Sequence, residues 1–365
     1  MDRLSSYLSN CDPVLHIPIY FTLFNITWTY VVGELTGNCS QVDRMWTFFP
    51  TMYTAYYALL PSLPFAPKDI QEAGLNYRVC LMLALQVFWM TRLSYNTWRR
   101  GLFAFKDEDY RWQILRDSMP VSLFHVFHFV FIAAMQNAIL FGLGYPAYLA
   151  LRNPNAPLGI YDALLVALSI IDVLVEFAAD NQQYSYQTFK HSKRPRVQKP
   201  EKEEWFWAKQ RWSEDDAERG FIVRGLWAWS RHPNFAAEQT FWWLMTLFPI
   251  LTGPGSLDPP SIQTILSPET YQSIASLLSA YGSLQPLLPG IIISFLFLGS
   301  TRFTEWITKK KYPVRYKAYQ RRVGMFSPIG TVFKGWYLQA TGERKKVDDL
   351  LWGPVKALNG TKKAN

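Results

Sequence analysis

Seven long apolar segments follow one another along this chain of 365 residues, and they constrain its fold more than any other feature. Six of them hold about 20 residues, the length that an α-helix needs to cross a bilayer, and the fourth is longer. A single segment could be the core helix of a soluble protein, but seven in series, with Trp and Tyr at several ends, are typical of a membrane protein. The segments cover residues 14–35, 45–65, 75–93, 119–151, 158–179, 234–252 and 284–303. We therefore predict an all-α, polytopic membrane bundle of about seven transmembrane helices.

The basic residues predict which side of the membrane each loop faces. Most of the 37 Lys and Arg residues lie in residues 92–117, 181–232 and 301–365, while the loops between these regions are nearly free of them. Because cytoplasmic loops are enriched in Lys and Arg, the pattern places the N-terminus in the lumen and the C-terminus in the cytosol. The net charge of +9 is thus explained by topology, and we expect no nucleic-acid partner.

Composition narrows the class of protein further. The chain is 49% hydrophobic and 16% aromatic but only 18% charged, which is unlike an ordinary soluble protein of this length. Its cysteines, Cys11, Cys39 and Cys80, show neither metal-binding spacing nor a disulfide framework. The stretch Lys362-Lys363-Ala364-Asn365 resembles the dilysine retrieval signal of endoplasmic-reticulum membrane proteins. We therefore predict a multi-pass protein of that membrane, with the bilayer as its main partner.

A polar cluster stands at the start of the sixth segment, within residues 225–238. Pro233 suits the first position of a helix, which places His232 at the cap boundary. Asn234 and Glu238 are four residues apart and share one helix face, and Arg231 lies close to that face. A helix N-terminus with an arginine nearby favours anions, so the cluster predicts an anion-binding site.

Other polar residues interrupt the apolar segments. Asp172, Glu176 and Asp180 have the spacing i, i+4, i+8 and form one acidic stripe, as functional acids in membrane spans do. The alternative is that Asp180 alone is functional and the other two pair structurally. His125 and His128 could ligate a metal, but no third ligand has suitable spacing, so we favour hydrogen-bonded core roles and predict no metal.

Regions outside the spans carry weaker signals. Residues 253–283 form a long, nearly uncharged loop that we interpret as a luminal lid or an interfacial helix. Residues 201–212 hold Trp205, Ala208 and Trp212 on one helical face, which predicts a helix in the headgroup layer. We divide the chain into three parts. These are residues 1–117 with three spans and the first basic loop, residues 118–340 as a cofactor-binding membrane domain, and residues 341–365 as a basic cytosolic tail.

Four blocks of sequence resemble the steroid 5-alpha-reductase-like membrane family, whose superfamily includes sterol reductases and isoprenylcysteine carboxyl methyltransferase. The blocks are Thr91 to Trp112, Ala179 to Lys190, Gly225 to Glu238 with its Ser-Arg-His-Pro-Asn-Phe core, and Glu305 to Pro328 with Tyr312, Gln320 and Phe326. The resemblance implies a seven-helix bundle that binds NADPH from the cytosolic side and takes a hydrophobic lipid substrate from the bilayer.

The resemblance also implies roles for individual residues. Asp180, Asn234 and Glu238 would bind the polar groups of the cofactor. Arg231, His232 and Arg92 would meet its phosphates and ribose, together with residues of the tail. The full set of expected cofactor residues is Arg92, Asp180, Gln183, Arg231, His232, Asn234, Glu238, Glu305, Tyr316, Tyr319 and Arg322.

The reaction that the resemblance implies is hydride delivery to an activated C=C bond, for which an acid must polarise the substrate. Steroid 5-alpha-reductases place a Glu in the second helix and a Tyr before the Arg of the third. Here the second segment has no acid, and Trp89 stands about where the Tyr would be. The candidate catalytic residues that take these roles are Tyr53, Tyr57, Tyr95 and Glu34.

We therefore expect an NADPH-dependent oxidoreductase that reduces a C=C bond in a membrane lipid such as a sterol, a steroid or an enoyl lipid. One alternative is a membrane methyltransferase that uses S-adenosylmethionine, because distant relatives share an Arg-His-Pro motif. The other is a non-catalytic lipid-binding protein, which the missing ketone donors would favour.

Overall fold

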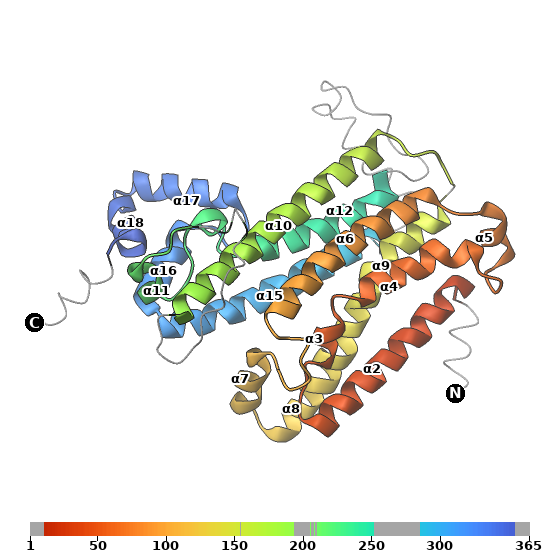
Figure 1. Ribbon diagram of the computed structural model, residues 1–365, viewed down its shortest axis with the longest axis horizontal. Helices are drawn as coiled ribbons and strands as arrows, with labels where there is room; N and C mark the ends of the chain where they lie inside the picture. The colour runs from red at the N-terminus through yellow and green to blue at the C-terminus, as the bar shows by residue number, and fades with distance from the viewer. Residues whose placement is uncertain are drawn as a thin grey trace, which may run out of the picture. The chain divides into compact units, whose positions relative to one another are not determined.

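The computed structural model describes residues 11–153, 155–192, 205, 208, 210–251 and 285–354. All regular secondary structure in these ranges is helical, which confirms the all-α class (Figure 1). The chain forms two compact units, each built from two stretches of sequence. The first unit holds Met1–Ile170 with Trp242–Ile293, and the second holds Ile171–Phe241 with Ser294–Asn365. The predicted lid at 253–283 and most of the predicted helix at 201–212 lie outside the described residues.

The first unit is a bundle of long helices. Its main elements are α2 (His16–Thr36), α4 (Phe49–Leu59), α6 (Tyr77–Arg99), the start of α10 (Ile160–Ser192), and the helical run of α8 (Val121–Phe127), the π-helix η3 (His128–Met135) and α9 (Gln136–Arg152). Helix α4 packs against α9 and α6, and α2 packs against η3 and α9. Gly144 lets α9 pack closely on α4, since a Cβ there would lie 2.5 Å from the Cβ of Tyr53.

A buried ion pair joins α6 to the start of α10. Asn76 caps α6 by accepting from the backbone N–H groups of Arg78 and Val79. Arg78 then binds Asp162 with two bonds, Nε to Oδ1 at 2.7 Å and Nη2 to Oδ2 at 3.0 Å. Both side chains are almost fully buried, so the pair fixes the two helices at this end of the unit.

The basic stretch 92–117 contains an ordered short helix rather than only a loop. Helix α7 (Tyr110–Ser118) begins at Asp109, whose side chain accepts from the N–H of Arg111. The preceding turn is held by Arg44, which donates to the carbonyls of Ala104, Phe105 and Asp107. The unit also contains the short helices α3 (Gln41–Met45) and α5 (Lys68–Ala73).

The second unit contains the remainder of α10 and several shorter helices. These are α11 (Glu214–Arg219), the 3-10 turn η5 (Gly225–Ala228), the start of α12 (Pro233–Leu251), most of α15 (Leu288–Lys311), α16 (Pro313–Arg322), α17 (Pro328–Ala340) and α18 (Arg344–Trp352). Phe221 packs on Tyr316 and Tyr319 in its core. Gly220 has φ +88° and sits against the ring of Tyr312, where a Cβ would lie 2.0 Å from a ring carbon.

Two stretches of the described chain are long and apolar enough to cross a membrane, Val121–Arg152 and Gln285–Lys311. Four further predicted segments coincide with long helices, α2, α6, α10 and α12, whereas the segment 45–65 does not form one spanning helix. Helix α4 has 11 residues, a length of about 16 Å, because Pro50 is tolerated only in its first turn and Pro61 follows its end. The count of seven spans and the orientation of the termini stay predictions.

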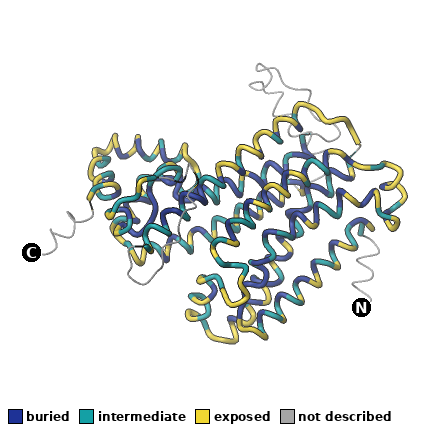
Figure 2. Tube along the Cα trace, viewed as in Figure 1, coloured by how far each residue is buried: buried dark blue, intermediate teal, exposed yellow. Residues whose placement is uncertain are grey.

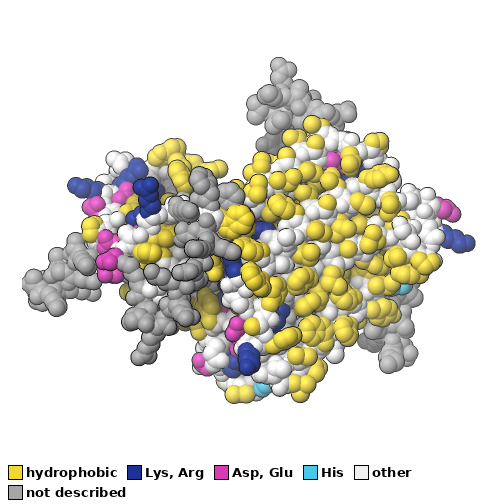
Figure 3. All heavy atoms as spheres, viewed as in Figure 1, with side chains coloured by type: hydrophobic (Ala, Val, Ile, Leu, Met, Phe, Trp, Pro, Cys, Tyr) yellow, Lys and Arg dark blue, Asp and Glu magenta, His cyan; other side chains and the backbone are white. Residues whose placement is uncertain are grey.

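The helices of the first unit carry large hydrophobic side chains on their outer surface as well as in the core. Buried positions line the inner sides of these helices (Figure 2), and hydrophobic side chains are spread over their visible outer surface (Figure 3). Exposed examples include Tyr20, Phe24 and Leu35 on α2, Val121 and Val130 on α8 and η3, and Leu164 on α10. An apolar surface of this extent is compatible with contact to membrane lipid.

Candidate functional site

The polar cluster at the start of α12 is held by backbone pairing with the tail. The stretch 228–232 lies along the segment that follows α16. Arg231 donates its backbone N–H to the carbonyl of Gly324 at 2.9 Å, and His232 donates to that of Met325 at 3.1 Å. These bonds fix both residues from a segment about 90 positions later in the chain, so their side-chain directions are set by the backbone.

One threonine closes the same contact from α17. Thr331 Oγ1 accepts from the backbone N–H of Gly324 at 2.7 Å and donates to the carbonyl of Trp229 at 2.5 Å. Tyr319 Oη donates to the carbonyl of Trp227 at 2.5 Å. The side chain of Tyr319, a predicted cofactor residue, thus binds the backbone of residues 225–238, which we call the motif.

Glu305 is the centre of a group of polar side chains that we call the Glu305 cluster: the buried Arg231, His232 and Glu305, and the half-buried Gln320. Arg231 binds it with two bonds, Nε to Oε1 at 2.6 Å and Nη2 to Oε2 at 3.1 Å. His232 Nε2 lies 3.0 Å from Oε1, and Gln320 Nε2 donates to Oε2 at 2.8 Å. The remaining Arg231 nitrogen, Nη1, donates to the carbonyl of Val323. A carboxylate that accepts several bonds is well satisfied despite its burial.

The protonation of His232 follows from this environment. Burial lowers the pKa of His232 below its ordinary value, although the facing carboxylate of Glu305 acts in the opposite direction. The ring is therefore neutral at pH 7. Because a carboxylate only accepts, the Nε2 atom of His232 carries the hydrogen. Burial also raises the pKa of Tyr316 and of Tyr319, so both phenols stay protonated.

A second polar group lies beside this cluster, where the second half of α10 meets the start of α12. Asn234 Nδ2 donates to Asp180 Oδ1 at 3.1 Å. Asn234 Oδ1 and Gln183 Oε1 are buried oxygens with no hydrogen-bond partner in the described structure. Leaving a buried acceptor unpaired costs on the order of 1–3 kcal/mol. Such acceptors suit a ligand that brings hydroxyl or amide N–H donors, and we call Asp180, Gln183 and Asn234 the acceptor group.

The structure requires a glycine at position 225, the first residue of the motif. Gly225 has φ +62°, and a Cβ there would lie 2.5 Å from Gln182 Oε1. The same oxygen accepts from the backbone N–H of Leu226 at 2.9 Å. Trp227 Nε1 donates to the carbonyl of Ala179 at 3.2 Å. The first residues of the motif are thereby pinned to α10, next to the acceptor group.

The predicted cofactor residues separate into three kinds of environment. Asp180 and Asn234 form one pair, while Arg231, His232 and Glu305 form the Glu305 cluster. Glu238 is buried on the same helix as Asn234. The guanidinium nitrogens of Arg231 are all bonded to protein oxygens, so its contact with a phosphate stays a prediction.

The remaining predicted cofactor residues are Tyr316, Arg322 and Arg92. Tyr316 is buried in the core of the second unit, and its hydroxyl faces Glu305 and Arg231 of the Glu305 cluster. Arg322 Nε binds Asp348 at 3.0 Å, and its guanidinium lies over the ring of Trp352. Arg92 is buried in the first unit. The structure therefore does not place Arg322 in either polar group of the second unit.

The four predicted catalytic residues all belong to the first unit. Tyr53 Oη lies 2.7 Å from Thr22 Oγ1. Tyr57 is fully buried, and its hydroxyl has no hydrogen-bond partner among the described residues. Tyr95 lies under the guanidinium of Arg99, 5.1 Å from the ring centre. The Tyr57 hydroxyl thus differs from that of Tyr53, which is paired with Thr22.

Glu34 bridges the two histidines of the fourth apolar segment. Its Oε1 lies 2.6 Å from His128 Nδ1, and its Oε2 lies 2.7 Å from His125 Nδ1. His128 begins the π-helix η3, and π-helical turns occur frequently at functional sites. Gly33 gives the ring of His128 its space, because a Cβ there would lie 2.6 Å from the ring. His128 is buried and hydrogen-bonded, as predicted from the sequence. The predicted core role of His125 is wrong, because its side chain is 51% exposed and pairs with Glu34 at the surface.

No set of three or more His, Cys, Asp or Glu side chains in the part of the chain that the structure describes could hold a metal ion. Sequence reasoning overlooked several residues that position the site. Gln182, Gln320 and Thr331 support the motif, although the first two lie inside blocks that carried the resemblance. Lys334 was also missed; its Nζ donates to the carbonyls of Gln320 and Val323. No signal in the sequence indicates the roles of Thr331 and Lys334.

Comparison with known proteins supports the resemblance in part, because the matched range includes three of the four sequence blocks that carried it. Residues 29–280 match the family described as "Protein of unknown function (DUF1295)". The chain belongs to the DUF1295 family. This family is part of the steroid 5-alpha-reductase-like group, and the matched range includes the acceptor group and the motif but ends before Glu305. The chain is also similar to the uncharacterized protein C594.04c of Schizosaccharomyces pombe, with 30% identity over 336 residues, which are 89% of this chain and 83% of the relative. No solved structure matches.

Proposed function

We propose that this DUF1295 protein is an NADPH-dependent reductase of a C=C bond in a membrane lipid. The observation that carries the proposal is the acceptor group. It presents the Asp180 carboxylate and two unpaired buried oxygens, those of Asn234 and Gln183, where the second half of α10 meets the start of α12. Membership in the steroid 5-alpha-reductase-like group supports the same reaction class.

The residues present fit a dinucleotide. Ribose hydroxyls and a nicotinamide carboxamide donate hydrogen bonds, which is what the unpaired oxygens of Asn234 and Gln183 require. The N-terminus of α12 favours a negatively charged pyrophosphate. The cofactor, when bound, would supply a hydride. The Glu305 cluster would position α12 and the motif, since Arg231 and His232 are bonded to Glu305.

The chain must also handle a proton, because reducing a C=C bond adds one hydride and one proton. Two groups of the first unit are candidates. The Tyr57 hydroxyl can donate to a substrate carbonyl, since no acceptor among the described residues binds its hydrogen. The Glu34 carboxylate with His125 and His128 forms a hydrogen-bonded relay that can pass a proton. Tyr53 is a weaker candidate because its hydroxyl is already paired with Thr22.

The experiment is deuterium transfer from NADPH labelled at the hydride position. The full chain in lipid nanodiscs is incubated with the labelled cofactor and a membrane lipid extract, and the lipids are analysed by mass spectrometry. The proposal expects a lipid class that gains one deuterium and one hydrogen, and little gain in Asn234→Ala. The matched control is Gly142→Ala, at a position with open space around it. Absence of label with wild type, or methyl transfer from S-adenosylmethionine instead, would overturn the proposal.

The same proposal includes the location. The endoplasmic-reticulum membrane predicted from the tail places such an enzyme where its lipid substrate would be found. Residues 362–365 lie outside the described structure, so this part rests on the sequence.

A further inference from the structure

Helix α17 turns its larger apolar side chains away from the protein. Ile329, Phe333, Trp336 and Tyr337 are between 60% and 67% exposed. Their spacing of i, i+4, i+7 and i+8 puts them on one stripe of the helix. The buried positions of α17 are instead Thr331, Gly335 and Leu338. This is the reverse of a helix at the surface of a soluble domain. We call these four exposed residues the α17 stripe.

The inner face of α17 fixes this orientation. Lys334 Nζ donates to the carbonyls of Gln320 at 2.6 Å and Val323 at 3.2 Å. Thr331 bonds to the backbone of Trp229 and Gly324. Rotating the helix to bury the α17 stripe would break these bonds and leave the carbonyls of Gln320 and Val323 without the donor that Lys334 supplies. The hydrogen bonds of the inner face therefore hold the stripe outward in the second unit.

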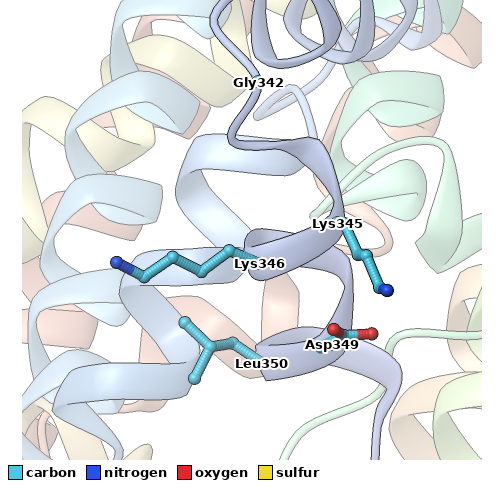
Figure 4. A pocket seen from close by; sticks show the side chains of 5 residues that line it. All are labelled: Gly342, Lys345, Lys346, Asp349 and Leu350. Atoms are coloured by element: carbon cyan, nitrogen blue, oxygen red, sulfur yellow. The ribbon is translucent and has the colours of Figure 1, made fainter.

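Basic residues follow the stripe directly. After a turn at Gly342 with φ +70°, α18 begins with Arg344, Lys345 and Lys346. Lys345 and Lys346 are exposed. They line a shallow depression of about 540 Å³ with Gly342, Asp349 and Leu350. The two lysine side chains extend to opposite sides of the helix (Figure 4). The α17 stripe is thus followed in the chain by the basic first turn of α18.

We propose that the α17 stripe is seated at the headgroup boundary of an anionic lipid leaflet, with Lys345 and Lys346 contacting the headgroups. A helix of 13 residues is about 20 Å long, too short to span a bilayer, so it lies in the interface plane. Trp and Tyr are enriched at that depth, and basic residues are attracted to anionic headgroups. The positive charge beside the stripe favours anionic lipid as the partner. A second copy of this chain would bring the same basic residues against it, and like charges repel. The inference does not depend on the proposed reaction.

The test uses the full chain in nanodiscs, with Cys11, Cys39 and Cys80 replaced by serine and one nitroxide label introduced. Labels at Phe333→Cys and Trp336→Cys probe the stripe, and a label at Lys317→Cys, an exposed position on α16, is the matched control. Collision rates with oxygen, which partitions into lipid, and with a water-soluble nickel chelate are compared. The proposal expects both stripe labels to favour oxygen several-fold and the control to favour nickel.

Two results would overturn the proposal. One is nickel accessibility of both stripe labels equal to that of the control, which would leave the stripe in water. The other is protection from both reagents with spin–spin broadening, which would show a second copy on the stripe. The charge is tested separately with Lys345→Gln/Lys346→Gln. Nanodiscs that contain phosphatidylserine should favour oxygen contact more than phosphatidylcholine alone in wild type, and this difference should shrink in the variant. An unchanged difference would contradict the headgroup contact.

Discussion

The two units each bury an arginine–carboxylate pair of nearly the same geometry. Arg78 binds Asp162 through Nε at 2.7 Å and Nη2 at 3.0 Å, and Arg231 binds Glu305 through the same atoms at 2.6 Å and 3.1 Å. All four side chains are at most 5% exposed. By pair chemistry alone, the two sites are indistinguishable.

Their further partners differ. Asp162 also accepts from the backbone N–H of Gly159, and Arg78 also donates to the carbonyl of Pro157. Glu305 instead gathers the side chains of His232 and Gln320 at the start of α12. The comparison teaches that a buried pair is informative about function only through the polar groups that it holds in place. The first pair joins helices, whereas the second positions a motif next to unpaired acceptors.

The largest expected effect comes from breaking each pair on its carboxylate side. Glu305→Ala and Asp162→Ala should each reduce the free energy of unfolding by about 3–5 kcal/mol, because each leaves a buried guanidinium uncompensated. Denaturant unfolding in detergent measures both. Only Glu305→Ala should also weaken stabilisation by NADPH. A loss of that stabilisation of the same size in Asp162→Ala would break the comparison.

A smaller loss is expected at the motif glycine. Gly225→Ala should cost about 2 kcal/mol, because an L-residue at positive φ costs about 1–2 kcal/mol and its Cβ would meet Gln182. Thermal unfolding measures the change. The matched control is Gly299→Ala in α15, where no atom lies within 4 Å of the added Cβ. Equal stability of the two variants would contradict the turn geometry.

The pH dependence of stability is the next effect in size. The pKa of His232 is lowered by burial, so below the unfolded value of 6.5 the unfolded chain binds a proton that the folded chain does not. Stability should therefore fall as the pH drops below about 6.5, by at most about 1.4 kcal/mol per pH unit from this group, until the folded pKa is reached. His232→Gln should flatten this part of the profile. An unchanged slope in the variant would show that other groups cause it.

The smallest expected effect on folding is at the acceptor group. Asn234→Ala removes one hydrogen bond to Asp180, a net contribution of about 0.5–1.5 kcal/mol, together with an unpaired oxygen. Folding should change little, while affinity for NADPH should fall about tenfold. Isothermal titration against wild type measures the affinity. A variant that binds NADPH as tightly as wild type would remove Asn234 from the site.

Local features of the fold were predictable from the sequence. The length of the apolar segments located most of the helices, because a segment long enough to cross a bilayer satisfies its backbone hydrogen bonds best as a helix. Pro233 and the i, i+4 spacing of Asn234 and Glu238 correctly placed them at the start of α12. The exception was residues 45–65, where apolar length concealed the break that Pro50 and Pro61 impose on the helix.

Long-range pairing was not predictable. Glu305 lies 74 positions from Arg231, and Glu34 lies 94 positions from His128, so no periodicity connects them. The role of Arg231 illustrates the consequence. A positive charge at a helix start predicts an anion site, yet the tail supplies a carboxylate and a carbonyl that take up its donors. Such competition from distant protein groups becomes visible only in three dimensions.

The central claim is that the start of α12 and the end of α10 hold a nicotinamide dinucleotide. The most direct test is the binding of NADPH and S-adenosylmethionine to the purified full chain, measured as the shift in melting temperature with rising concentration of each. We expect a saturable shift with NADPH that is weaker in Asn234→Ala and unchanged in Gly142→Ala. A saturable shift with S-adenosylmethionine and none with NADPH would contradict it.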